Sequence, residues 1–64
     1  MRNLEKALDA KGISNEVVIS LLGIHRNTYT NKMSGKSEFT IGEAIKIKAN
    51  LLPEYELDYL FAPN

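Results

Sequence analysis

The sequence has no cysteine and no tryptophan, and only two prolines and one histidine among its 64 residues. Without cysteine the chain can form neither a disulfide nor a thiolate metal site, and a single histidine cannot complete a structural zinc site. No apolar run approaches the ~20 residues that a membrane-spanning helix needs, and Met1-Arg2-Asn3 does not open a signal peptide. We therefore expect one small domain over residues 1–64, in a reducing cytoplasmic setting, with no metal, cofactor or membrane.

An excess of charge of one sign is also missing, because eight basic side chains balance eight acidic ones. The charges are nevertheless unevenly placed. Residues 17–37 carry Arg26, Lys32 and Lys36 and no acid, whereas residues 50–64 carry three acids and no cation. A basic segment within a neutral chain is compatible with nucleic-acid binding, because the distribution of charge matters more than its sum. The acidic C-terminal segment is expected to face away from such a partner.

Helix-start and helix-stop signals recur along the chain, whereas alternating strand patterns and hairpin turns do not. Thr40 and Glu43 form a capping box, Gly23 suits the left-handed turn that ends a helix, and Pro53 suits the first turn of the last helix. The sequence thus predicts a compact all-α domain. The expected helices cover about residues 3–11, 15–22, 26–33, 41–51 and 53–61, followed by a tail at 62–64.

Two of these helices carry marked apolar patterns. The second holds Val17, Val18 and Ile19, which also suit a strand, but the N-cap Ser14 and the terminal Gly23 favour a helix. The fourth has the widest apolar face, so we expect it to be the central core helix. The residues of that face are Ile41, Ala44, Ile45, Ile47 and Leu51.

The third helix follows the tight turn at Gly23-Ile24, and its polar residues gather on one side. Thr28, Tyr29 and Met33 lie outside this polar arc and can pack inward. The arc, about 140° wide, contains Arg26, Asn27, Thr30, Asn31 and Ser34. Arginine suits the two acceptors of guanine, and asparagine suits the acceptor and donor of adenine. Two interpretations stay open from these residues alone, a solvated surface face and a face that reads DNA.

Residues 14–35 resemble the helix-turn-helix of the phage repressor and Cro-like (XRE) family. The matching elements are Gly23-Ile24 in the turn, Thr28-Tyr29-Thr30 in the second helix, and Ser34-Gly35-Lys36 after it. Residues 4–13, 38–47 and 57–61 are similar to the family's first, fourth and fifth helices. The resemblance implies a lambda-repressor-like five-helix fold. It also implies a bacterial or phage transcriptional regulator that binds operator double-stranded DNA as a homodimer.

The resemblance further assigns roles to individual residues. It places His25, Arg26, Asn27 and Asn31 against base edges, and it places Asn15, Thr30, Ser34 and Lys36 against the DNA backbone or in support of the base readers. His25 stands where the family commonly has a small N-cap residue, so it is expected to cap the helix or donate to a phosphate. Relatives commonly dimerise through the C-terminal part of the domain. The aromatic residues there either complete the core or form a dimer contact, and they are Tyr55, Tyr59 and Phe61.

Two bulky residues depart from the family pattern where the second and third helices cross. Ile19 stands in place of an alanine, and Tyr29 stands in place of an aliphatic residue. Either the crossing is wider than usual, or Ile19 turns partly outward while the Tyr29 hydroxyl reaches a polar partner.

Catalysis is not expected. Glu54, Glu56 and Asp58 have no histidine or metal partner nearby in the sequence and suit a solvated acidic face. A domain of this size also leaves little room for a pocket of ~300 Å³. The alternative to DNA binding is a protein-interaction module on the same fold, such as an antitoxin or an antirepressor partner. That module would use the acidic, aromatic C-terminal helix.

Overall fold

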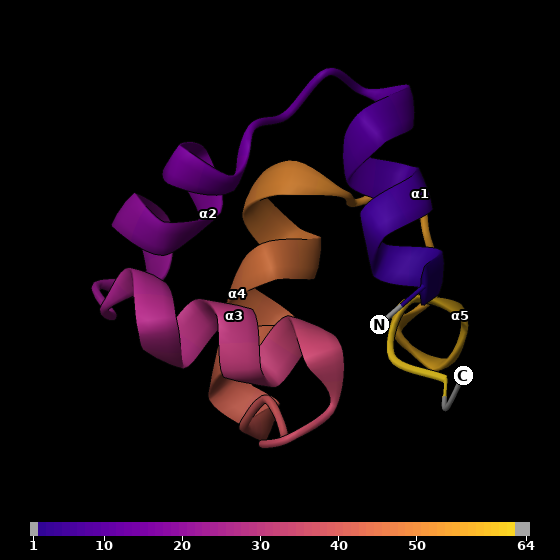
Figure 1. Ribbon diagram of the computed structural model, residues 1–64. Coiled ribbons are helices and arrows are strands. Elements are labelled where there is room, and N and C mark those ends of the chain that lie inside the picture. Colours follow the sequence, from indigo (N-terminus) through magenta and orange to yellow (C-terminus); the bar gives the residue numbers. More distant parts are fainter. Residues whose placement is uncertain (1, 63–64) are drawn as a thin grey trace.

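The computed structural model describes residues 2–62, and over these residues it contains five helices and no strand (Figure 1). The helices are α1 (Arg2–Ala10), α2 (Asn15–Leu22), α3 (Arg26–Ser34), α4 (Ile41–Leu51) and α5 (Leu57–Leu60). The predicted all-α class is confirmed. No helix in this part of the chain is long and apolar enough to cross a membrane. Positions 63 and 64 of the predicted tail lie outside the described residues.

Several helix boundaries coincide with capping residues of the sequence, although Ser14 at the start of α2 forms no side-chain capping bond. Gly23 ends α2 with a left-handed φ of 67°, and its N–H donates to the Ile19 carbonyl at 2.9 Å. At the start of α4, the Glu43 N–H donates to the Thr40 hydroxyl at 3.1 Å, and the Thr40 N–H donates to the Glu43 carboxylate at 2.9 Å. The predicted capping box is therefore present.

The last helix begins later than predicted. Pro53 does not open it, because α5 starts at Leu57 and residues 53–55 form a turn and a bend. Leu52 is fully buried and accepts a hydrogen bond from the Tyr55 N–H at 3.1 Å. The Pro53 carbonyl accepts a hydrogen bond from Lys48 Nζ at 2.9 Å. These contacts fold the segment into a turn around the buried Leu52. The turn forms in place of a helix that begins at Pro53.

The core is shared by all five helices and the Leu52 that follows α4. Its fully or almost fully buried side chains are Leu4, Ala7, Leu8, Val18, Tyr29, Ile47, Leu52 and Leu60. The prediction that α4 buries a wide apolar face is wrong, because Ile41 is 79% exposed and Ile45 is 50% exposed. Only Ile47 of α4 is buried. The four-residue α5 leaves an open groove beside Ile41 at the start of α4.

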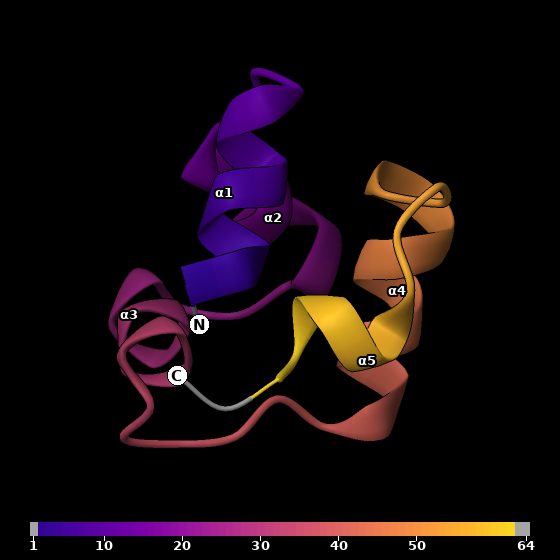
Figure 2. The same cartoon turned by 90° about the vertical axis from the view of Figure 1, so that its right-hand side faces the viewer.

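The helices are arranged so that α3 stands at the edge of the molecule. Figure 1 shows α4 in the middle, with α1 and α5 on one side and α2 on the other. Asn3 joins α1 to α5 by donating to the Tyr59 carbonyl at 2.9 Å. Figure 2 shows α3 end-on at the periphery, away from α4 and α5. The polar face of α3 therefore belongs to the outer surface of the protein.

Candidate nucleic-acid interface

The residues predicted to contact DNA are all on the surface. His25, Arg26, Asn27 and Asn31, the predicted base readers, are exposed on or just before α3. The predicted backbone contacts are exposed as well, namely Asn15, Thr30, Ser34 and Lys36. Tyr29 is the single buried residue of α3. The arrangement leaves a helix whose polar side is free to approach a partner.

Tyr29 fastens α3 to the domain and also reaches the start of α2. Its side chain is only 3% exposed, and its hydroxyl donates to the Asn15 side-chain oxygen at 3.0 Å. Burial raises the pKa of Tyr29, and the negative charge of Glu5 adds to this rise. Ile19 is half-buried. The predicted polar partner of the Tyr29 hydroxyl is therefore confirmed, while Ile19 still packs against the core with part of its surface in solvent.

The bond from Tyr29 also orients the Asn15 side chain. Because the amide oxygen accepts from Tyr29, the amide NH₂ is the group left to donate outward. Asn15 is the first residue of α2, where free backbone N–H groups and the helix dipole favour an anion. Sequence reasoning missed this link, because it joins residues on two different helices.

The C-terminal end of α3 is closed by backbone hydrogen bonds around Asn31. Gly35 adopts a left-handed φ of 91°, and its N–H donates toward the Asn31 and Lys32 carbonyls. The Asn31 carbonyl also accepts from the Lys36 N–H at 2.9 Å, the Ser37 N–H at 3.2 Å and the Ser34 hydroxyl at 3.1 Å. The backbone beneath the Asn31 side chain is therefore firmly fixed.

Lys32 joins α3 to α4 and contributes little free charge. Its Nζ lies 2.9 Å from the Glu43 carboxylate and donates to the Glu38 carbonyl at 3.0 Å. The same atom lies 5.8 Å from the centre of the Phe39 ring, within cation–π range. The side chains of Lys32 and Glu43 are only 11% and 19% exposed. Burial acts to raise the pKa of Glu43, but hydrogen bonds from Thr40 and Lys32 outweigh it and hold the pKa below its usual value.

Arg26, the first residue of α3, is paired with Glu16 of α2. Its Nη2 donates to the Glu16 carboxylate, and this hydrogen bond is the main reason that the pKa of Glu16 is lowered. Both side chains are largely exposed, at 61% and 66%. The segment 17–37 contains no acid in the sequence, but in space two of its three cations meet carboxylates from outside it. The expected basic surface is therefore weaker than the linear charge count predicts.

His25 occupies the N-cap position of α3 with an extended backbone, but its side chain forms no capping hydrogen bond. The expected capping role of its side chain is therefore wrong. Imidazole is bulkier than the serine, threonine or aspartate side chains that suit this position. The ring stays in solvent beside Arg26 and Asn27.

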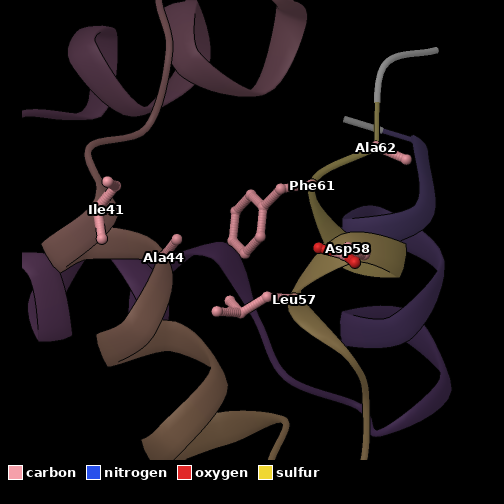
Figure 3. A pocket seen from close by; sticks show the side chains of 6 residues that line it. All are labelled: Ile41, Ala44, Leu57, Asp58, Phe61 and Ala62. Atoms are coloured by element: carbon pink, nitrogen blue, oxygen red, sulfur yellow. The ribbon is translucent and has the colours of Figure 1, made fainter.

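The other notable surface feature is an open groove of about 450 Å³ between α4 and α5. Leu57 of α5 and Phe61, which directly follows α5, project toward Ile41 and Ala44 of α4 (Figure 3). The remaining lining residues are Asp58 and Ala62. The groove is larger than the small pocket that the chain length was expected to allow. It stays open because the short α5 does not close over the start of α4.

The C-terminal aromatic residues serve partly in the core. Phe61 meets Phe39 edge to face, with ring centres 5.4 Å apart, and Tyr55 stacks on Tyr59 at 5.9 Å. Tyr55 and Phe61 pack against the buried core, whereas Tyr59 is 43% exposed. The core interpretation is thus confirmed for Tyr55 and Phe61, whereas Tyr59 lies at the surface.

The acidic residues near the C-terminus lie at the surface, and one of them is paired. Glu54 pairs with Lys11 of the α1–α2 loop at 2.9 Å, and the hydrogen bond from Lys11 lowers the pKa of Glu54. Glu56 and Asp58 are exposed. Within residues 2–62 no three acidic or histidine side chains come together in a way that could hold a metal ion.

Comparisons with protein-family models, with curated proteins and with solved structures find no match for this chain.

Proposed function

We propose that this protein is a sequence-specific double-stranded DNA-binding transcriptional regulator of the phage repressor and Cro-like type, with a lambda-repressor-like fold. The observation that carries this proposal is the construction of α3. The helix is fastened by one buried side chain, Tyr29, and offers an uninterrupted polar side to the exterior. A helix of this kind, entered through a tight turn from α2, suits the major groove of DNA.

The proposed roles divide along the two helices. Arg26, Asn27 and Asn31 read base edges, with His25 beside them at the entry to α3. Asn15 donates to a backbone phosphate with the amide NH₂ that its bond to Tyr29 leaves outward. Thr30, Ser34 and Lys36 contact the backbone or support the base readers.

We further propose that the protein binds DNA as a homodimer. Two copies would present two α3 helices to a palindromic operator, with half-sites about 34 Å apart. The exposed Tyr59, stacked on Tyr55, and the nearby Phe61 in the groove are the proposed contact. Aromatic side chains of this kind are enriched in protein interfaces.

The test is selection of bound duplexes from a random pool, followed by binding measurements on the selected operator. Asn31→Ala and Arg26→Ala are each expected to lose about 1–3 kcal/mol of discrimination at one base position. Asn50→Ala is the matched control, because Asn50 is exposed on α4 and, among residues 2–62, its side chain bonds to the Lys46 carbonyl of its own helix. If both α3 variants bind the operator as the parent does, the assigned reading face is wrong.

A second candidate function is a protein-interaction module, and the apolar groove between α4 and α5 is the observation that favours it. Ile41, which lines the groove, is 79% exposed, and exposed apolar patches often mark interaction surfaces. A gel shift with random duplex at low salt separates the two candidates, because phosphate binding appears there and falls steeply with salt. Complete absence of binding at micromolar protein favours the protein-interaction module.

A further inference from the structure

The ion pair between Glu16 and Arg26 places a carboxylate at the centre of the proposed DNA-binding surface. Glu16 is the second residue of α2, and Arg26 is the first residue of α3, so the pair bridges the openings of both helices. Neither side chain has a structural task in the core, since both are largely exposed. An exposed ion pair of this kind contributes little to stability. The main effect of the pair is therefore on the charge of this surface rather than on stability.

In this pair the carboxylate of Glu16 neutralises the positive charge of Arg26 at the start of α3. Lys32 is already held by Glu43 in a largely buried contact. With Arg26 held by Glu16, Lys36 is the one cation of segment 17–37 that has no acidic partner within residues 2–62. Affinity for DNA of any sequence depends on cations that neutralise phosphates. A surface built in this way attracts the phosphate backbone weakly.

We infer that Glu16 is a specificity-determining residue, which keeps Arg26 from binding phosphates of any sequence and leaves it for a base edge. This inference rests on the proposed function. A guanidinium carries five N–H donors, and Glu16 engages one side of it at Nη2. The other donors remain able to meet an acceptor pair such as the guanine edge. A phosphate that approached Arg26 instead would have to displace Glu16 or lie against its negative charge.

The experiment compares Glu16→Gln with Glu54→Gln on the operator selected above and on a scrambled duplex of the same composition. Both substitutions remove one negative charge from an exposed ion pair. Glu54 lies in the segment joining α4 to α5, which Figures 1 and 2 show at the far end of the molecule from α3. The Glu54 variant thus controls for the change in net charge.

Glu16→Gln is expected to bind the scrambled duplex more tightly than the parent, while its preference for the operator falls. Release of one phosphate-binding cation steepens the loss of affinity between 50 and 200 mM salt by about threefold. Glu54→Gln is expected to match the parent in both respects. In an Arg26→Ala background the effect of Glu16→Gln is expected to shrink, because no guanidinium remains to be released.

Two results overturn the inference. One is a Glu16→Gln protein whose operator preference and salt dependence equal those of the parent. The other is an equal change in Glu16→Gln and Glu54→Gln, which would assign the effect to net charge alone. In both cases the parent still binds its operator, so the proposed function stands. A parent that selects no duplex at all overturns the proposed function and this inference together.

Discussion

The two ends of α3 are held by ion pairs of opposite character. At its start, Arg26 and Glu16 meet in solvent, with side chains 61% and 66% exposed. Near its end, Lys32 and Glu43 meet under the α3–α4 loop, with side chains 11% and 19% exposed. An exposed pair is screened and easily exchanged, whereas a pair that has lost its water is costly to break. The same helix therefore has an anchored end and an end that remains available to a ligand.

The largest effect is expected from breaking the anchored end. Glu43→Ala removes both the partner of Lys32 and half of the capping box. We expect the free energy of unfolding to fall by roughly 2–4 kcal/mol, because a poorly solvated ammonium is left unpaired and a helix cap is lost. Urea denaturation monitored by circular dichroism measures the loss. Lys32→Met, which keeps the capping box, is expected to cost less.

The pH dependence of stability is expected to follow the same pair. The pKa of Glu43 is lower in the folded protein than its ordinary value of 4.5. Its contribution is therefore fully present above pH 4.5 and is lost as the pH falls through the lower folded value. The stability difference between the parent and Glu43→Gln should thus be larger at pH 7 than at pH 3. A difference that stays constant across this range would show that the Glu43 charge is not involved.

A smaller effect is expected from Tyr29→Phe, which keeps the buried ring but removes the hydroxyl that bonds Asn15. Loss of this hydrogen bond should lower the free energy of unfolding by about 1 kcal/mol. Tyr55→Phe is a suitable control, because no hydrogen bond of the Tyr55 hydroxyl is seen within residues 2–62. Equal losses in the two variants would contradict a stabilising bond between Tyr29 and Asn15.

The smallest effect on stability is expected at the available end of α3. Arg26→Ala should change the free energy of unfolding by no more than about 0.5 kcal/mol, since the pair with Glu16 is exposed. The same denaturation assay applies. A loss as large as that of Glu43→Ala would erase the contrast between the two ends and would make Arg26 a structural residue.

Local features of the fold could be predicted from the sequence because their causes are local. Thr40 and Glu43 are three residues apart, and Gly23 and Gly35 directly follow the helices that they end. The start of α5 could not be predicted in this way. Pro53 fits the first turn of a helix, but the burial of Leu52 and the half-burial of Tyr55 fold the same segment into a turn.

The contacts of the candidate site were less accessible to sequence reasoning. Arg26 and Lys32 looked like free cations because their carboxylate partners, Glu16 and Glu43, lie on neighbouring helices. The apolar pattern of α4 likewise predicts that Ile41 and Ile45 are buried, but both are exposed. Periodicity does not reveal whether another element is present to cover them. In contrast, the inward position of Tyr29 could be predicted, because it follows from helical spacing alone.

The small number of buried side chains on α3 has a consequence for how such a protein can change. The eight other residues of this nine-residue helix are not fully buried, and most of them are exposed. Surface substitutions of this kind are usually close to neutral for folding. Positions such as Asn27, Thr30 and Asn31 can therefore vary between lineages with little penalty to the fold. A single scaffold could in this way give rise to a series of proteins with different binding preferences.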